Sequence, residues 1–135
     1  MNRFKRVIAF HLPTAAYYYV KMRRQLKKNG TVEEDYKVCK EVVSAVSKKA
    51  KGSVEVFGLE NLPSENENYI LCPNHQGKFD GLAVVTAMDR PVAFLIDSAR
   101  SDMVFEKEFM DLNRAKRISL KNPSEAIKAL RAMRD

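Results

Sequence analysis

The sequence predicts an α/β fold, in which a mostly parallel sheet flanked by helices follows an N-terminal two-helix segment. Three observations lead to this fold class. Two long amphipathic patterns fill residues 1–52, and short apolar runs then alternate with helical patterns over residues 53–135. Residues 92–96 form a continuous apolar run, as in parallel strands that are covered on both faces.

We therefore expect two parts: a basic, aromatic, membrane-associating segment over 1–52, and the front part of an α/β domain over 53–135. A chain of 135 residues is long enough for one hydrophobic core but not for two. The predicted sheet has few strands, and the last predicted helix carries no stop signal before Asp135. The sequence therefore predicts a C-terminally incomplete domain.

The first element is predicted as a helix over residues 3–28 that is kinked at Pro13 and ended by Asn29 and Gly30. It combines many apolar and aromatic side chains with bases at both ends, which is typical of a helix lying on a membrane surface. An ordinary helix packed on its own domain or on a partner subunit is the alternative. A nucleic-acid-binding arm is disfavoured, because the tyrosines at 17–19 crowd together instead of alternating with bases.

The excess positive charge lies in one terminal segment. Lys and Arg number 24 against 17 Asp and Glu, yet residues 1–30 contain eight basic side chains and no acidic one. The predicted partner of this segment is an anionic membrane surface, and no nucleic acid is expected. The apolar stretch 7–20 is shorter than the roughly 20 residues that cross a bilayer and lacks a clear cleavage site. Peripheral or monotopic association with the cytoplasmic face of the cell membrane is therefore expected.

The second helix has clear start and stop signals. Thr31 and Glu34 form a predicted capping box, and Gly52 is placed as the stop. Apolar side chains recur every three or four residues and predict one buried stripe. Its members are Tyr36, Cys39, Val43, Val46 and Ala50. Two cysteines exclude a disulfide framework, favour a reducing compartment and give no sign of a metal site.

Beyond residue 52, short strands and helices are expected to alternate. Apolar runs predict strands at 54–57, 69–72, 92–96 and 117–120, and helices at 79–88 and 101–110. A last helix begins at Pro123, after the N-cap signal of Asn122. Its inward-facing residues are predicted to be Ile127, Leu130 and Met133.

The candidate chemistry lies in residues 73–80, between a predicted strand and a predicted helix, where α/β sheets commonly bind ligands. His75 and Asp80 would lie about 140° apart on a continuous helix, so they meet only if the chain turns between them. Gly77 is expected to supply the backbone freedom for this turn. A carboxylate on one ring nitrogen leaves the other free to take a proton from a hydroxyl. Alternatively, His75 caps a turn and Asp80 is a helix N-cap.

The flanking residues carry a family resemblance. Gly58, Glu60, Asn61, Leu62 and Pro63 are followed by an apolar run and then by Asn-His-Gln-x3-Asp at 74–80. Over residues 54–130 this pattern resembles the glycerolipid acyltransferase family, in particular bacterial 1-acyl-glycerol-3-phosphate acyltransferases. Those proteins share a G-x-E-N-[IL]-P segment, an N-H-x4-D block and a membrane-associating N-terminal region.

The resemblance implies transfer of a fatty acyl group from acyl-CoA or an acyl carrier protein thioester to the 2-hydroxyl of a lysophosphatidate, in phospholipid synthesis. It implies that His75 is the general base and that Asp80 orients it, with no acyl-enzyme and no cofactor beyond the thioester. The implied substrate-binding residues are Asn74, Gly77, Lys78, Arg117 and Lys121.

Three departures from the family pattern stand out. Gly77 occupies a position where the family commonly has serine, and Lys121 replaces an arginine that helps to hold the acceptor phosphate, with Arg117 as its near neighbour. The phosphate-binding F-P-E-G-T block is absent. A non-catalytic membrane- or partner-binding module is therefore the alternative function. Cys72 is expected to be a packed thiol of a buried strand and not a nucleophile.

Overall fold

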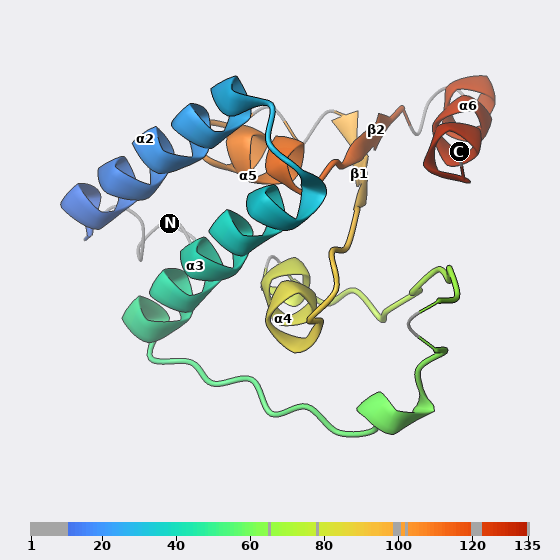
Figure 1. The fold of residues 1–135 in the computed structure, drawn as a ribbon, viewed down its shortest axis with the longest axis horizontal. Coiled ribbons are helices and arrows are strands. Elements are labelled where there is room, and N and C mark those ends of the chain that lie inside the picture. Colours follow the sequence, from blue (N-terminus) through green and yellow to red (C-terminus); the bar gives the residue numbers. More distant parts are fainter. Residues whose placement is uncertain are drawn as a thin grey trace.

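The computed structural model describes residues 11–64, 66–77, 79–98, 101, 103–119 and 123–134. Helices and a small parallel sheet together form a mixed α/β arrangement, so the predicted class is confirmed at this coarse level (Figure 1). The helices are α2 (Leu12–Lys28), α3 (Val32–Ala50), α4 (Asp80–Ala87), α5 (Glu106–Leu112) and α6 (Pro123–Arg134), with a 3-10 turn η1 (Leu59–Asn61). The strands are β1 (Leu95–Asp97) and β2 (Lys116–Ile118).

Helix α2 begins at Leu12, so the expected kink at Pro13 is wrong. Pro13 lies in the first turn, where a helix needs no amide donor. The predicted end is confirmed, because Asn29 takes a left-handed conformation with φ 48°. The part of the prediction that covers residues 3–10 lies outside the described residues. No helix in the described part of the chain is both long and apolar enough to cross a membrane.

Helix α3 begins with the predicted capping box. The Glu34 amide donates to Thr31 Oγ1 at 3.3 Å, and the Thr31 amide donates to Glu34 Oε2 at 3.1 Å. At the other end Lys51, and not Gly52, takes the left-handed conformation, with φ 52°. The Gly52 amide donates to Ser47 O at 3.1 Å, so glycine sits one residue beyond the position that needs its flexibility.

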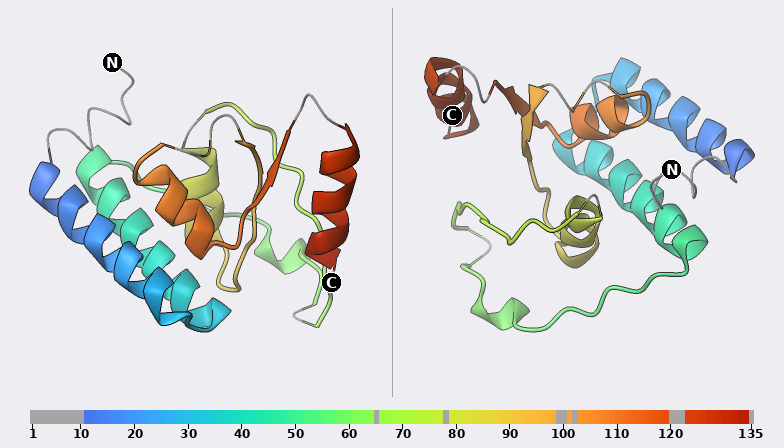
Figure 2. Two further views of the ribbon diagram at one scale, coloured as in Figure 1. Left: turned by 90° about the horizontal axis from the view of Figure 1, so that it is seen from above. Right: turned by 180° about the vertical axis from the view of Figure 1, so that it is seen from behind.

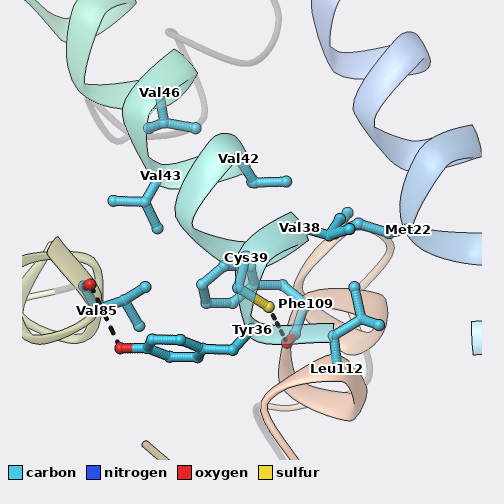
Figure 3. Close-up of a cluster of buried hydrophobic side chains, with 10 residues drawn as sticks. All are labelled: Met22, Tyr36, Val38, Cys39, Val42, Val43, Val46, Val85, Phe109 and Leu112. Carbon is cyan, nitrogen blue, oxygen red and sulfur yellow. Dashed lines mark hydrogen bonds between the residues drawn. The ribbon is translucent and has the colours of Figure 1, made fainter. Parts of the chain in front are cut away.

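The hydrophobic core forms where four helices meet (Figure 3). Helix α3 supplies most of it, including the fully buried Cys39 that the stripe predicted. The Tyr36 hydroxyl reaches across to α4 and donates to Met88 O at 3.1 Å. Residues from both sides of position 52 share this core, and the division into parts 1–52 and 53–135 stays a prediction. The core members are Met22, Tyr36, Val38, Cys39, Val42, Val43, Val46, Val85, Phe109 and Leu112.

The sheet consists of β1 and β2, which run parallel with Ile96 opposite Arg117. Strand β1 overlaps the predicted strand 92–96, and β2 overlaps the predicted strand 117–120. Both predicted strands are therefore confirmed, although each observed strand is only three residues long. Leu95 is 41% exposed, so the expectation of a strand covered on both faces is wrong.

The predicted strands at 54–57 and 69–72 are wrong. Both segments are extended but without strand pairing, and Phe57 and Ile70 are 87% and 82% exposed. A strand is stabilised by hydrogen bonds to a neighbour, and no strand among the described residues lies beside either segment. The chain between α3 and α4 therefore runs outside the helical layer (Figure 1).

The other helices follow the sequence signals with shifted bounds. Helix α4 lies within the predicted 79–88, and α6 begins at Pro123 as expected. Helix α5 begins later than predicted, after Phe105, whose φ of 77° is incompatible with a helix. Ile127 is 52% exposed, so its inward position is wrong; the side chains of Leu130 and Met133 lie outside the described part. Helix α6 packs beside β2, at the opposite end of the molecule from α2 (Figure 2).

Candidate active site

The candidate site lies where the extended segment 66–77 turns into α4. Asp80 is the first residue of that helix, and Phe79 is its N-cap. His75 precedes the turn, and its Nδ1 lies 2.9 Å from Asp80 Oδ2. The structure thus brings together the two residues that the sequence placed five positions apart. The alternative in which Asp80 is the N-cap of this helix is therefore wrong.

One carboxylate oxygen holds the whole turn. Asp80 Oδ2 accepts hydrogen bonds from the Gln76 amide at 2.6 Å and from the Gly77 amide at 2.8 Å, in addition to its contact with His75. The Asp80 amide in return donates to Gly77 O at 3.2 Å. The turn is therefore closed by bonds that run in both directions between residues 75 and 80.

These contacts favour the ionised form of Asp80. The Gly77 amide, then the Gln76 amide and then His75 lower the pKa of Asp80 below its ordinary value of 3.8. An ionised carboxylate only accepts hydrogen bonds, so the proton between the two side chains must sit on His75 Nδ1. In a neutral imidazole this leaves Nε2 without a proton and able to accept one.

The pair is open to solvent. The His75 side chain is 74% exposed and that of Asp80 is 29% exposed. A hydroxyl-bearing substrate therefore has access to the imidazole without a rearrangement of the described residues.

Gly77 is not required by the backbone of the turn. Among the described glycines only Gly58 has a positive φ, and a β-carbon added at Gly77 would meet nothing within 4 Å. The expectation that the turn needs a glycine here is therefore wrong. The closing bonds to Asp80 use the amide of residue 77, which any residue except proline provides.

Arg117 already has two partners inside the protein. Its Nε donates to Ser101 Oγ at 2.8 Å, and its Nη2 lies 2.7 Å from Asp111 Oδ1. Neither partner belongs to the turn at 75–80. The structure gives Asn74 an exposed position next to His75, whereas Lys78 and Lys121 lie outside the described residues. The substrate-binding roles of these residues stay predictions.

Cys72 is exposed and lies in an unpaired segment three residues before His75. The prediction that it is packed inside a strand is therefore wrong, because that strand does not form. Cys39 is the buried thiol, and burial raises its pKa to about 12. No group of three or more potential metal ligands occurs among the residues that the structure describes.

Sequence reasoning missed one residue that supports the segment leading to the site. Arg90 Nη1 donates to Glu67 O at 3.1 Å, and its guanidinium lies 5.3 Å from the centre of the Tyr69 ring. A single side chain thus ties the otherwise unpaired segment to the loop after α4. No spacing or motif in the sequence signals this contact, because it joins residues more than 20 positions apart.

Comparisons of this chain with protein-family models, with curated proteins and with solved structures give no match.

Proposed function

We propose that the chain is an acyltransferase domain that transfers a fatty acyl group from a thioester to the 2-hydroxyl of 1-acyl-glycerol-3-phosphate. The observation that carries this proposal is the 2.9 Å contact between His75 Nδ1 and Asp80 Oδ2, with Asp80 held ionised by two backbone amides. The proposal is also supported by the match of residues 58–63 and 74–80 to the family motifs.

The chemistry follows from this pair. His75 Nε2 accepts the proton of the acceptor hydroxyl as its oxygen attacks the thioester carbonyl carbon. Asp80 stabilises the imidazolium that forms. The C–O bond forms, the C–S bond breaks, and the departing thiolate takes the proton from the imidazolium. No acyl-enzyme is formed, and the thioester, from acyl-CoA or an acyl carrier protein, is the co-substrate.

The surface of α2 supports a location at an anionic membrane. The helix exposes apolar and aromatic side chains in its first half, with Leu12 at 67%, Tyr17 at 60% and Val20 at 46%. Its last two turns expose only basic charges, including Arg24 and Lys28. Exposed apolar and aromatic side chains followed by basic ones are consistent with a helix that binds an anionic membrane surface. The acceptor is an amphiphile, so such a helix would hold the site beside its substrate.

The test is acylation of lysophosphatidate by the wild-type chain and by His75→Ala. We expect the substitution to lower the rate by a factor of about 10² to 10⁴, which is the usual contribution of a general base. His11→Ala removes the other histidine of the chain and serves as the control. Acylation by His75→Ala at near the wild-type rate would show that His75 is not the general base.

A non-catalytic membrane-binding module is the second candidate. It is favoured by Arg117, whose guanidinium is engaged by Asp111 and Ser101 and not by the turn at 75–80. Sedimentation with anionic vesicles, combined with a thioester-release assay, separates the two functions. Vesicle binding without acyl transfer supports the module, and acyl transfer that depends on His75 supports the enzyme.

A further inference from the structure

Residues 66–77, which lead into the turn at 75–80, have few contacts with the rest of the molecule. Every side chain of this segment is exposed except that of Tyr69, which is half-buried. Among the described residues, no strand pairs with the segment, and no hydrogen bond holds the chain between Tyr69 and His75. The position of His75 therefore depends on what holds the two ends of this segment.

The carboxylate of Asp80 holds one end, and Arg90 holds the other. Arg90 Nη1 donates to Glu67 O at 3.1 Å and to Ser64 O at 3.5 Å. The guanidinium also lies 5.3 Å from the centre of the Tyr69 ring. A guanidinium within about 6 Å of an aromatic ring centre is attracted to the face of that ring. Arg90 thus binds both the backbone and the one half-buried side chain of the segment.

The loop that carries Arg90 is itself fixed to the core. The Tyr36 hydroxyl of α3 donates to Met88 O at 3.1 Å, and Met88 is 7% exposed. Lys40, also on α3, donates to Asp89 Oδ1 at 2.8 Å. The two residues before Arg90 are therefore held by α3. Arg90 connects this fixed loop to a segment that has little other support.

The contacts of Arg90 shorten the free chain next to the turn. With Tyr69 held, only about 5 residues separate it from His75; without Arg90, about 13 residues separate the end of η1 at Asn61 from His75. The probability that the ends of a flexible chain meet falls roughly as the 3/2 power of its length. Loss of the Arg90 contacts should therefore make closure of the turn about fourfold less favourable.

We propose that Arg90 is a positioning residue, which holds the segment 66–77 so that His75 stays against Asp80. The inference rests on the proposed acyl transfer, because it names a positioning residue for that reaction. The contacts of Arg90 with the segment are made at Tyr69 and earlier residues, so Arg90 acts on His75 through the chain. A contact with only local importance would leave the turn at 75–80 unchanged when it is removed.

Amide hydrogen exchange of Gln76 and Gly77 in the wild type and in Arg90→Gln tests the inference. Both amides donate to Asp80 Oδ2, so their exchange reports how often the turn opens. We expect both to exchange about fourfold faster in Arg90→Gln. The amide of Val42, in the middle of α3, should exchange at the wild-type rate, because the core is not changed.

Arg23→Gln is the matched control for this measurement. Arg23 lies 5.7 Å from the centre of the Tyr19 ring and donates to its hydroxyl at 3.1 Å, so the substitution removes an arginine–tyrosine contact of the same kind on α2. Exchange at Gln76 and Gly77 should keep its wild-type rate in this variant.

Tyr69→Leu is a second variant that removes the other partner. It keeps an apolar side chain but has no ring for the guanidinium. We expect faster exchange at Gln76 and Gly77 here too. The double variant Arg90→Gln/Tyr69→Leu should show less than the product of the two single effects, because both substitutions remove the same contact.

The kinetics of acyl transfer separate positioning from substrate binding. Arg90→Gln should lower kcat and leave the KM for lysophosphatidate unchanged, because Arg90 acts on the general base and not on the acceptor. A raised KM with an unchanged kcat would contradict the inference.

Three exchange results would also overturn it: wild-type exchange at Gln76 and Gly77 in Arg90→Gln, equal acceleration in Arg23→Gln, or equal acceleration at Val42, which would show a general loss of stability. The proposed function fails separately. Faster exchange in Arg90→Gln without any acyl transfer by the wild type would preserve the contact and contradict the enzyme. Acyl transfer that depends on His75, with unchanged exchange in Arg90→Gln, would preserve the enzyme and contradict the inference.

Discussion

At the scale of single residues, the carboxylate of Asp80 determines the geometry of the candidate site. Its Oδ2 atom accepts hydrogen bonds from the amides of Gln76 and Gly77 and contacts the imidazole of His75. The sequence could predict that a histidine and an aspartate meet here, because both residue types and their spacing are visible in it. It could not predict the two amide donors, since backbone groups have no residue signature.

Asp80 should make stability depend on pH in acid. Its pKa in the folded chain lies below its ordinary value of 3.8, so the folded state binds fewer protons than the unfolded state near that pH. Its contribution is complete above about pH 4 and is lost as the pH falls through the folded pKa. We therefore expect Asp80→Asn to be less stable than the wild type at pH 6, with a difference that shrinks toward pH 2.

Urea unfolding of both proteins from pH 6 to pH 2 measures this difference. Asp89 also has a lowered pKa, through Lys40, but it is present in both proteins and cancels in the comparison. A difference that stays constant over this range would show that the ionised carboxylate does not stabilise the turn.

At the scale of helices and strands, the predictions succeeded where the stabilising contacts are local. The capping box of α3 joins residues three apart, and Pro123 begins α6 through its own fixed φ. The strands at 54–57 and 69–72 failed because a strand depends on a distant neighbour, which an apolar run does not specify. Cys72 was expected to be buried in the second of these strands, and it is exposed because that strand does not form.

The capping box gives a prediction for α3. Thr31→Ala removes the oxygen that accepts the Glu34 amide, so we expect a loss of about 1 kcal/mol in the free energy of unfolding. Ser44→Ala, at an exposed position in the middle of the same helix, should cause no loss. Thermal or urea unfolding measures both. Equal stability of Thr31→Ala and the wild type would mean that the cap is not formed in solution.

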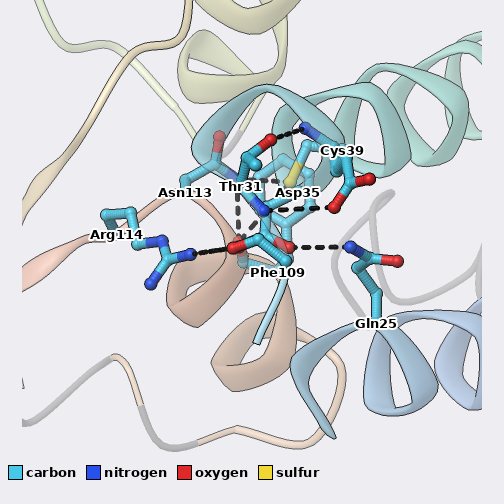
Figure 4. Close-up of polar contacts among 9 residues, drawn as sticks. Gln25, Thr31, Asp35, Cys39, Phe109, Asn113 and Arg114 are labelled. Carbon is cyan, nitrogen blue, oxygen red and sulfur yellow. Dashed lines mark hydrogen bonds and ion pairs between the residues drawn. The ribbon is translucent and has the colours of Figure 1, made fainter. Parts of the chain in front are cut away.

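At the scale of the whole molecule, a polar cluster joins segments that are far apart in the sequence (Figure 4). Asp35 of α3 is only 3% exposed and accepts from Gln25 of α2 at 3.0 Å and from Arg114, after α5, at 2.5 Å. Arg114 also donates to Gly30 O at 3.1 Å. The fold class could be predicted from alternating patterns, but this junction could not, because its residues are separated by up to 84 positions.

Arg114→Ala should therefore destabilise the helical core. It leaves the buried carboxylate of Asp35 with Gln25 as its side-chain partner, and an incompletely satisfied buried group costs about 1–3 kcal/mol. Arg131→Ala, on the exposed surface of α6, should change stability by less than about 0.5 kcal/mol. Chemical denaturation distinguishes these outcomes, and similar effects of the two substitutions would contradict the role of the cluster.

The most direct measurement is the tautomer of His75 in the wild-type chain at pH 8, read from the nitrogen shifts and long-range proton couplings of its ring. The chain has two histidines, and His11→Ala assigns the signals. The geometry predicts a proton on Nδ1 and a bare Nε2, with this preference weakened in Asp80→Asn. A proton on Nε2 in the wild-type chain would contradict the account, because the imidazole could then not accept the proton of the acceptor hydroxyl at that nitrogen.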